Sequence, residues 1–436
     1  MLCKIVRWTK ESGTLRIMYI DHYAGSLRDG MEFRPYYLAR EWVKEGHVVR
    51  VIGADYSHLR VNQPDVQYDF QMEEIDGIEY QWIRAGHYQN NGIKRALSMV
   101  RFVAKLFLKA KKIAHEFRPD VVVTSSTYPL DSFAGNRIAK NAKAVYIHEA
   151  HDVWPLTLVE LGGMSRRHPF VCLLGYSERY AYRHAAKVIS ILPNTLEHMI
   201  EVGLDSEDKF TYIPNGVALQ DWENMEELPE QHTILFETLK RENKFIVCYC
   251  GGHALSNALE TLVDAADKLK YCENVEIVFV GKGSEKESLM KQVESKHLTH
   301  VHFLPPVKKT QVPNLLAQSD ALYIGAASCS LYRYGISMNK VYDYMMAGKP
   351  ILYGIEASNN EVEEAQCGLT IPAGNAKKLA EAIMEVAAMS ANQRERMGQN
   401  GRKWVIKNCD YSQLSKRFLD TIASARNCAI MGRKYS

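Results

Sequence analysis

The sequence predicts an α/β protein of two domains, each built on a mainly parallel sheet. The chain has 436 residues, 46% of them hydrophobic, which is too long for one ordinary core and sufficient for two. Short runs rich in β-branched and aromatic residues alternate with helical patterns, as in βαβ units whose sheets are covered on both faces. A polar, acidic stretch, "DWENMEELPEQ", interrupts this alternation, which then restarts.

The expected strands follow that alternation. In the first domain they are "LRIMYIDHY", "HVVRVIGA", "IEYQWIR", "PDVVVTSS", "AVYIHEA", "AKVISIL" and "FTYIPNG"; in the second they are "KFIVCYC", "VEIVFVG", "VHFLPP", "ALYIGAA", "PILYG" and "GLTIP". The boundary is expected near residues 206–243, with domains at 1–215 and 216–408 and a terminal helix, 409–436, that packs back on the first domain. Parallel sheets bind ligands beyond the carboxyl ends of their strands, so we expect a site in a cleft between the domains.

Composition excludes several classes of function. The formal net charge of +3 is small for this length and gives no reason to expect nucleic-acid binding. Nine cysteines without a CxxC or Cys/His spacing are typical of a reducing compartment. The start "MLCKIVRWTKESG" lacks the apolar core of a signal peptide, and no run of about 18 apolar residues is present. We therefore expect a cytoplasmic protein that spans no membrane.

The stretch "YGISMNKVYDYMMAGKP" predicts a helix over residues 338–347, with Ser337 as the N-cap and a glycine and a proline at its end. Asn339 and Lys340 then lie in the first turn, where free backbone N–H groups favour an anion. A cation there is unfavourable by about 0.3–1 kcal/mol unless something negative joins it. Asp343 lies one turn further on and could accept hydrogen bonds from sugar hydroxyls. The alternative is an ordinary surface helix.

In order along the chain, "DGMEFRPYYLAREWVKEGHVVRVIGA", "HEAHDVWPLTLVELGG", "YIPNGV", "FVGKGSEKESL" and "NKVYDYMMAGKPIL" resemble the family 4 retaining glycosyltransferases. The resemblance covers nearly all of the chain beyond residue 15 and is closest to the branch that acts in capsule, exopolysaccharide and O-antigen assembly. Most of the family has two glutamates, eight residues apart, that contact the donor. Asp343 matches the second of these, and Gly335 replaces the first.

The resemblance implies the GT-B fold, in which two Rossmann-like domains face an interdomain cleft. It also implies transfer of a sugar from a nucleotide donor to a saccharide or lipid-linked saccharide acceptor, and we expect the donor to be a uridine diphosphate (UDP) sugar. The resemblance further implies that the anomeric configuration is retained through front-face attack. No Asp-x-Asp follows an expected strand, so we expect no metal and no cofactor besides the donor.

On the donor side, Gly251, Gly252 and His253 precede the expected helix "NALETLVDAADKL", where glycines let the backbone approach a phosphate. The family often has an arginine and a lysine in this region, and their absence here should place more of the phosphate binding on Lys340. Gly281 and Gly283 make a similar turn, expected near the nucleotide base. The alternative in each case is a plain tight turn.

In the first domain, "YIHEAHDVWP" ends a strand and gathers polar side chains at the carboxyl edge. His151, with Asp152, matches the family's histidine near the anomeric centre, and Glu149 is a rival that could stabilise charge or act as a base. The alternative is that the polar side chains of this stretch have only a structural role. The loop after the first strand brings four further candidates for the acceptor or a phosphate: Gly25, Gly30, Glu32 and Arg34. The alternative is that these four residues bind no ligand and belong to an ordinary solvated loop.

A basic amphipathic pattern, "IKRALSMVRFVAKLFLKAKKIAHEF", lies between two expected strands. Its basic residues Lys94, Arg101, Lys105, Lys109 and Lys112 share one helical arc of roughly 80°, and apolar residues fill most of the remainder. Such a helix suits an anionic membrane surface, which predicts a peripheral location on the inner face of the cytoplasmic membrane. The alternative is a core helix with a solvated lysine face.

Two other functions stay open at the level of the sequence. A nucleotide-sugar epimerase shares this architecture but needs carboxylates and basic residues around both the anomeric and the neighbouring carbon. A non-catalytic saccharide-binding membrane module would explain the missing first glutamate. Hydrolysis of the donor by the purified protein would distinguish an enzyme from a binding module. A reaction that requires an acceptor would distinguish a transferase from an epimerase.

Overall fold

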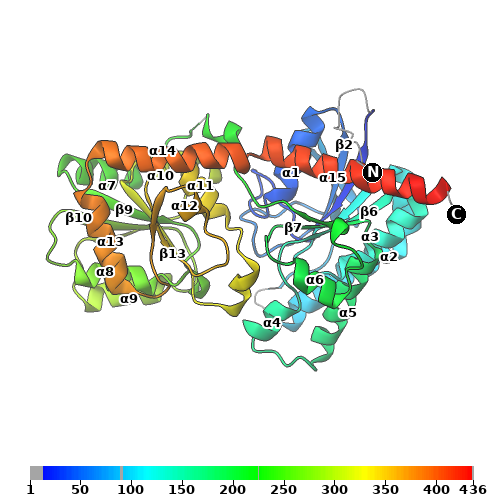
Figure 1. Cartoon of the computed structure of the whole chain (residues 1–436), viewed down its shortest axis with the longest axis horizontal. Coiled ribbons are helices and arrows are strands. Elements are labelled where there is room, and N and C mark those ends of the chain that lie inside the picture. The colour runs from blue at the N-terminus through cyan, green and yellow to red at the C-terminus, as the bar shows by residue number, and fades with distance from the viewer. Residues whose placement is uncertain (1–12, 89–91, 224, 435–436) are drawn as a thin grey trace. The chain divides into compact units, whose positions relative to one another are not determined.

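The computed structural model describes residues 13–88, 92–223 and 225–434. The chain forms two compact units: an N-terminal unit of Met1–Pro214 together with Tyr411–Ser436, and a C-terminal unit of Asn215–Asp410 (Figure 1). Each unit contains its own sheet, and the prediction of two mainly parallel sheets is confirmed. None of the described helices is both long and apolar enough to cross a bilayer.

The sheet of the N-terminal unit has the order β3-β4-β2-β1-β5-β6-β7-β8. Its strands are β1 (Arg16–Ile20), β2 (Val48–Ala54), β3 (Gln71–Ile75), β4 (Ile78–Ile83), β5 (Val121–Thr124), β6 (Val145–Ala150), β7 (Lys187–Ser190) and β8 (Phe210–Tyr212). All neighbours pair in parallel except β3 and β4, which are antiparallel. The sequence analysis missed β3, "QMEEI", because an edge strand with this many polar residues carries little of the usual strand signal.

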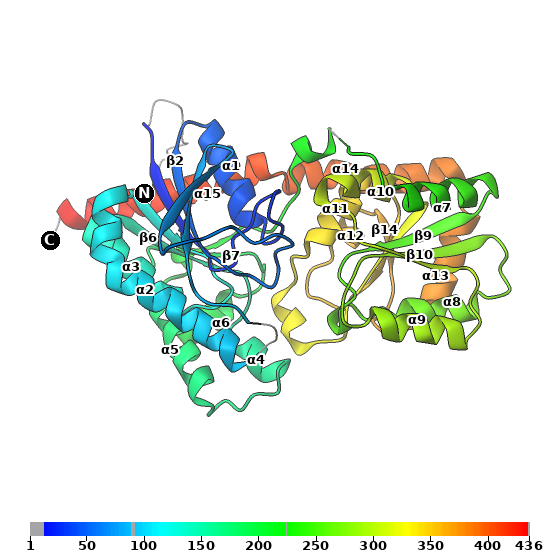
Figure 2. The ribbon, with the colours of Figure 1, turned by 180° about the vertical axis from the view of Figure 1, so that it is seen from behind.

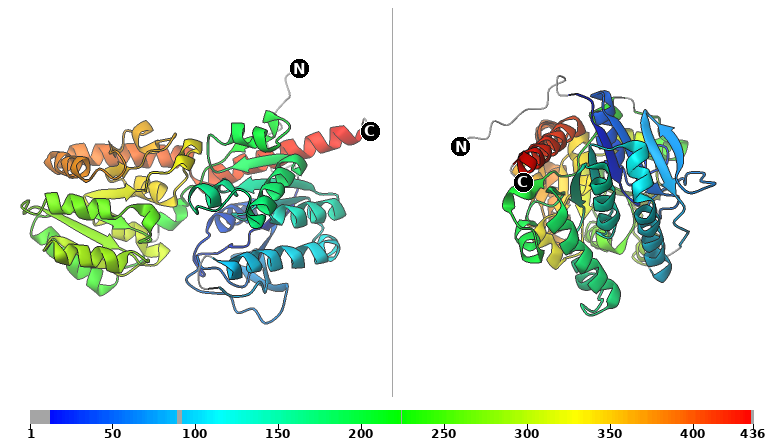
Figure 3. Two further views of the ribbon diagram at one scale, coloured as in Figure 1. Left: turned by 90° about the horizontal axis from the view of Figure 1, so that it is seen from below. Right: turned by 90° about the vertical axis from the view of Figure 1, so that its right-hand side faces the viewer.

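Helices cover both faces of this sheet. On one face Met18 and Ile20 of β1 pack in a core with α2 (Ile93–Phe117), α3 (Asp131–Ala142), α5 (Pro169–His184) and α6 (Leu196–Val202). Figure 2 shows these four helices beside the sheet. On the other face Tyr19 contacts Trp42 of α1 (Arg34–Lys44) and Phe418 of α15 (Tyr411–Lys434), drawn in red in Figure 3. The indole of Trp42 donates to the carbonyl of Ser415 at 3.3 Å. A short α4 (Leu156–Glu160) follows β6.

The C-terminal unit has a wholly parallel sheet of order β11-β10-β9-β12-β13-β14. Its strands are β9 (Phe245–Cys250), β10 (Val275–Val280), β11 (Val301–Leu304), β12 (Ala321–Gly325), β13 (Ile351–Gly354) and β14 (Gly368–Thr370). One face packs against α7 (Glu230–Arg241), α10 (Val312–Ala317), α11 (Asn339–Ala347) and α14 (Ala391–Asn408). The other packs against α8 (Glu260–Lys268), α9 (Lys286–Ser295) and α13 (Ala376–Ala388), and α12 (Glu361–Glu364) precedes β14.

The segment after β9 departs from the expected helix start. The helix expected from residue 257 begins only at Glu260, after a 3₁₀ turn, η4 (Leu255–Asn257). Ala258 has a φ of +43°, a left-handed conformation that no α-helix can continue through. Asn257 therefore lies outside the helix, where its side chain is free to bond elsewhere.

Candidate active-site residues of the two units

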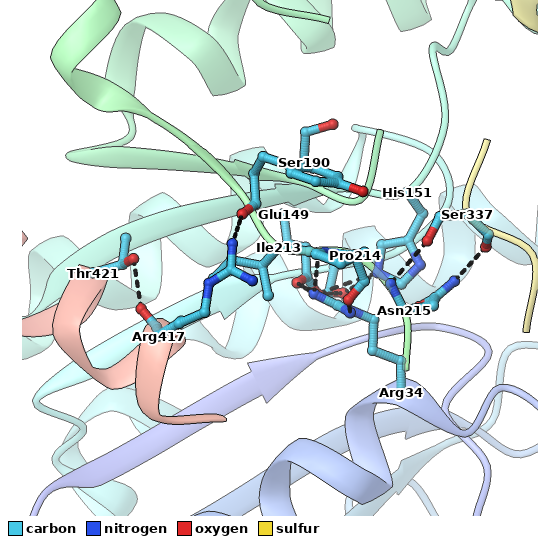
Figure 4. Close-up of polar contacts among 12 residues, drawn as sticks. Arg34, Glu149, His151, Ser190, Ile213, Pro214, Asn215, Ser337, Arg417 and Thr421 are labelled. Atoms are coloured by element: carbon cyan, nitrogen blue, oxygen red, sulfur yellow. Dashed lines mark hydrogen bonds and ion pairs between the residues drawn. The ribbon is translucent and has the colours of Figure 1, made fainter. Parts of the chain in front are cut away.

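Glu149, at the end of β6, lies at the centre of a buried network in the N-terminal unit. Arg34 donates to its Oε1 from Nε at 3.0 Å and Nη2 at 2.8 Å, and both side chains are fully buried (Figure 4). The hydroxyls of Tyr19 and Ser125 donate to Oε2, the latter at 2.6 Å. Burial alone would raise the pKa of Glu149, but Arg34 and then His151 hold it well below its usual range. Glu149 is thus an ionised anchor with both oxygens occupied, which does not fit the expected role as a base.

Arg34 also has a structural role that the sequence did not reveal. Nη1 donates to the carbonyl of Pro214 at 2.6 Å, and Nη2 donates to that of Ile213 at 2.9 Å. The guanidinium therefore ties the start of α1 to β6 and to the segment where the chain leaves this unit. A bidentate contact from Arg34 to a ligand phosphate stays a prediction, and the structure gives the guanidinium other partners, Glu149 and these two carbonyls.

His151 lies beside this network with one ring nitrogen engaged. Its Nε2 is 2.6 Å from Ser125 Oγ and 3.2 Å from Glu149 Oε2. Because Glu149 is ionised and only accepts, Nε2 must carry a proton. Burial alone would lower the pKa of His151, but the hydrogen bond and charge of Glu149 raise it above its usual value. Nδ1 has no hydrogen-bond partner in the described chain, so it is the nitrogen a ligand could meet.

Asp152 turns away from this arrangement into the following segment. Its carboxylate accepts from the backbone N–H of Val153 at 2.7 Å and from the hydroxyl of Thr157 at 2.9 Å. Burial raises its pKa. Asp152 therefore shapes the turn that leads into α4, and its expected role beside His151 has no hydrogen bond to support it.

The loop after β1 folds back on itself. A Cβ on Gly25 would lie 1.8 Å from the carbonyl oxygen of Gly30, so only glycine fits there. Gly30 itself has a φ of +103°, which glycine adopts at no steric cost. Glu32 is half-buried, and its side chain has no hydrogen-bond partner among the described residues. The two glycines thus set the shape of the loop, and Glu32 is the member left with free acceptor atoms.

Asp21 is a candidate residue that the sequence analysis missed. It directly follows β1, is 2% exposed and accepts from the backbone N–H of Tyr23 at 2.9 Å. Burial raises its pKa to about 7, and the nearby His151 works against that rise. An acid directly after a buried strand, at the same sheet edge as "HEAHD", was the available signal.

In the C-terminal unit, Lys340 lies in the first turn of α11 as expected. Its Nζ donates to the Tyr249 hydroxyl at 3.0 Å and to Asn257 Oδ1 at 2.7 Å, and it lies 5.1 Å from the centre of the Tyr249 ring. No carboxylate of the described residues lies within 4.0 Å of Nζ. Burial lowers the pKa of Lys340 to about 8.

The candidate glycines of this unit lie close to one another. Gly251 has a φ of +156°, and a Cβ on it would lie 2.9 Å from Lys340 Cδ. A Cβ on Gly281 would lie 1.9 Å from the carbonyl oxygen of Gly251, and a Cβ on Gly283 would lie 2.2 Å from the carbonyl oxygen of His253. Packing between the loops after β9 and β10 thus accounts for Gly281 and Gly283. Gly252 alone faces open space, with nothing within 4 Å of its Cβ position.

His253 is fully buried beneath these loops. Neither ring nitrogen has a hydrogen-bond partner in the described chain. The rings of Tyr249, Phe279 and Phe303 surround it with centroids 5.9–6.2 Å away. Burial lowers its pKa to about 4, so the imidazole is neutral at physiological pH.

Asp343 carries an ion pair that the sequence did not indicate. Both of its oxygens accept from Lys309 Nζ, at 2.7 and 2.6 Å. Lys309 belongs to a 3₁₀ turn, η5 (Lys309–Gln311), that directly precedes α10. Each carboxylate oxygen keeps a second lone pair, so Asp343 can still accept from a sugar hydroxyl.

Ser337 is not the N-cap of α11. The helix begins at Asn339, and Met338 is the N-cap residue, with no side-chain cap. The Ser337 hydroxyl accepts from the backbone N–H of Asn215, and its carbonyl accepts from Asn215 Nδ2, both at 2.8 Å (Figure 4). The tertiary contact to the first residue of the unit takes the hydroxyl that would otherwise cap the helix. The Asn339 side chain has no hydrogen-bond partner among the described residues.

Metal-binding side chains are not grouped in the described part of the chain: no three His, Cys, Asp or Glu residues lie together as a metal ion would need.

Comparison with known proteins identifies the chemistry of both units. Residues 29–216 match the model of a glycosyl transferase 4-like domain, and residues 230–404 match that of the glycosyl transferases group 1. The chain is 24% identical over 290 residues to the glycosyl transferase WcaI of Escherichia coli K12, whose name assigns it provisionally to colanic acid biosynthesis; the match covers 64% of this chain and 69% of WcaI.

Solved structures share the fold. HepE of Anabaena, in complex with UDP and glucose, matches with a TM-score of 0.65 at 16% identity, covering 94% of this chain and 100% of HepE. Sucrose-phosphate synthase from Thermosynechococcus elongatus matches with a TM-score of 0.71 at 16% identity, covering 94% and 99%. WaaG, from lipopolysaccharide biosynthesis, matches with a TM-score of 0.64 at 16% identity, covering 93% and 99%. This chain is a glycosyltransferase with the GT-B fold, composed of a glycosyl transferase 4-like domain and a group 1 domain.

Proposed function

We propose that this glycosyltransferase is retaining and metal-independent, and that it moves a sugar from a UDP-sugar donor to a saccharide or lipid-linked saccharide in surface polysaccharide assembly. HepE, which binds UDP-glucose, and WaaG, which acts in lipopolysaccharide biosynthesis, support the donor class and the pathway. WcaI supports a polysaccharide product.

The surroundings of Lys340 carry this proposal. Cleavage of a nucleotide sugar requires stabilisation of the negative charge that develops on the leaving diphosphate. Lys340 supplies a cation without a carboxylate partner, at the start of α11, where the helix dipole is positive. The N–H of Gly252 donates to no described residue and lies in the neighbouring loop. A bound diphosphate would satisfy all of these groups.

The geometry around Glu149 supports retention by front-face attack. A double displacement needs a carboxylate that can reach the anomeric carbon. Glu149 is fully buried and has both oxygens engaged by Arg34, Tyr19 and Ser125, so it cannot approach a substrate. The departing phosphate is then the base that takes the acceptor proton, and His151 holds the transferred sugar through Nδ1.

Lys340→Met tests the donor site. The substitution keeps the apolar stem and removes the charge, so UDP should bind more weakly by about 1.5–3 kcal/mol, while uridine binds almost as before. The kcat/KM for the donor should fall further than the affinity, because charge on the leaving group grows in the transition state. Isothermal titration calorimetry and donor-hydrolysis kinetics measure both effects.

The matched control is Lys296→Met, which removes a cation paired with Asp264 on the surface of the same unit. It should leave UDP binding and turnover unchanged. Wild-type UDP affinity and turnover in Lys340→Met would contradict the phosphate role. A product that forms only when an acceptor is present excludes epimerisation.

A membrane surface on α2 is the second part of the proposal. Met99, Phe102 and Leu106 are buried against the sheet. A separate apolar stripe on the same helix faces outward, with Ile93 81% and Leu108 79% exposed; Leu97 and Val100 belong to it as well. The apolar arc is therefore wider than the core contact requires, as the helical pattern predicted. Exposed apolar residues beside basic ones fit the interface of an anionic bilayer.

Lys105, one of the basic residues expected on this surface, is occupied within the unit. Lys105 donates to both carboxylate oxygens of Asp69, at 2.8 and 2.7 Å, and to the carbonyl of Arg84 at 2.8 Å. Arg101 and Lys109 are exposed and lie beside the apolar stripe. The proposed membrane contact thus consists of these two residues and the stripe, without Lys105.

Arg101→Glu combined with Lys109→Glu should release the protein from vesicles of phosphatidylglycerol and phosphatidylcholine. At about 1 kcal/mol for each basic residue near the surface, loss of the two cations weakens binding about 30-fold at low salt. Vesicle co-sedimentation measures it. Arg402→Glu with Lys403→Glu makes the same change of net charge on exposed residues of α14 and should bind like the wild type. If both double variants bind the vesicles equally well, the proposal that α2 forms a membrane surface is wrong.

A further inference from the structure

We propose that Tyr249 and Asn257 are positioning residues that form a neutral fork, the Tyr249/Asn257 fork, which holds the Lys340 ammonium in place for a nucleoside diphosphate before that ligand binds. The inference rests on the proposed donor site and adds what organises it. Neither residue stands out in the sequence, since Tyr249 reads as a strand residue and Asn257 as part of a helix.

The carbonyl of Gly252 fixes both side chains of the Tyr249/Asn257 fork. The Tyr249 hydroxyl donates to the Gly252 carbonyl at 2.7 Å, and Asn257 Nδ2 donates to the same oxygen at 2.9 Å. The tyrosine oxygen and Asn257 Oδ1 are then left as acceptors, and Lys340 Nζ fills both. Donors and acceptors match throughout this network, so the ammonium position is set by side chains that the Gly252 peptide orients.

The nearest carboxylate on α11 is kept away from Lys340. Asp343 lies three residues further along the helix, at the spacing where opposite charges normally pair. It is bound instead to Lys309 at 2.6 and 2.7 Å. Lys340 is therefore left with neutral partners, although an acid lies within one turn of it.

Neutral partners suit a phosphate-binding cation. A carboxylate would cancel the charge of the ammonium, and an incoming phosphate would then have to displace it. An amide oxygen and a hydroxyl hold the same ammonium in one position through their dipoles and leave its net charge in place. The glycine at 251 makes room for this, because a Cβ there would meet Lys340 Cδ at 2.9 Å.

Diphosphate binding should consequently depend on pH. Burial lowers the pKa of Lys340 to about 8, so the amine loses its proton as pH rises through that value and affinity for a diphosphate falls. The other titratable groups near it stay neutral in this range: burial raises the pKa of Cys250 to about 12 and lowers that of His253 to about 4, and that of Tyr249 is raised. Asp343 and Lys309 face this region as an ion pair.

Asn257→Asp tests the fork, with UDP and uridine as the probes in calorimetry at pH 7 and pH 9. The new carboxylate would neutralise Lys340, so UDP affinity at pH 7 should fall about tenfold or more, while uridine affinity changes less than about twofold. In the wild type, UDP affinity should fall between pH 7 and pH 9 and uridine affinity should not. In the variant that fall should disappear, because the carboxylate raises the pKa of Lys340 above the tested range.

Tyr249→Phe gives a second test that keeps the packing of the ring. It removes one of the two acceptors for Nζ and should weaken UDP binding about threefold to tenfold without affecting uridine. Asn314→Asp, in a side-chain amide of α10 that bonds only the Glu226 carbonyl and Gln318, is the matched control and should behave as the wild type.

Two outcomes would overturn the inference. If Asn257→Asp and Tyr249→Phe, folded by circular dichroism, keep the wild-type ratio of UDP to uridine affinity and the wild-type pH dependence, the fork does not position Lys340. If the wild-type protein binds uridine with the same affinity as UDP, the diphosphate site itself is absent, and the proposed function fails together with the fork.

Discussion

Arg34→Met is expected to lower the free energy of unfolding of the N-terminal unit by about 3–5 kcal/mol. Arg34 and Glu149 are both fully buried, so removal of the guanidinium leaves an ionised carboxylate without its main partner and two carbonyls, of Ile213 and Pro214, without a donor. Hydrogen exchange of peptides that cover β6 measures the loss within this unit. A single melting temperature would not, because a chain of two units need not unfold in one step.

The matched control for Arg34→Met is Lys112→Met, which breaks the exposed pair with Glu116 on α2 and should cost less than about 0.5 kcal/mol. Arg34→Met combined with Glu149→Leu should recover much of the lost stability, because no charge is then buried alone. An Arg34→Met protein whose β6 exchanges at the wild-type rate would show that the pair contributes nothing.

His151→Ala is expected to lower turnover by two or more orders of magnitude while UDP binding stays within about twofold. His151 is held through Nε2 by Ser125 and Glu149, which leaves Nδ1 for the transferred sugar. The nucleotide is proposed to bind the C-terminal unit, so its affinity should not depend on this ring. Donor turnover and calorimetry with UDP separate the two effects.

His198→Ala is the control, because His198 is a half-buried histidine of the same unit. His198 Nε2 lies 2.8 Å from Glu178 Oε1, in a His–carboxylate pair much like that of His151, but it belongs to α6. This variant should keep turnover within about twofold. Equal loss of activity in both variants, or loss of UDP binding together with turnover in His151→Ala, would indicate a folding role for His151.

The strands and the edge that carries the candidate residues were predictable because they are local. Runs such as "PDVVVTSS" and "VEIVFVG" contain their own strand signal, and parallel strands place their carboxyl ends at one edge. The partners of the charged groups were not predictable. Arg34 meets Glu149 across 115 residues, Lys340 meets Asn257 across 83, and Lys309 meets Asp343 across 34. No local pattern encodes such pairings.

Helix starts failed for a related reason. Ser337 and Asn257 are good N-cap residues by type, and the sequence placed each at the beginning of a helix. In the structure Ser337 binds Asn215, and Asn257 binds Lys340 and the Gly252 carbonyl. A short polar side chain satisfies either a helix end or a distant partner, and only the folded chain decides between the two.

Helix α15 gives the N-terminal unit a discontinuous chain, because the unit is left at Pro214 and rejoined at Tyr411. Trp42 and Tyr19 pack against Phe418 of this helix, so one face of the first sheet is covered by residues that the ribosome makes only after the whole C-terminal unit. The C-terminal unit, in contrast, is one uninterrupted segment and can complete its core as soon as it has emerged. During synthesis the unit that begins first is therefore finished second, with Trp42 uncovered until translation reaches α15.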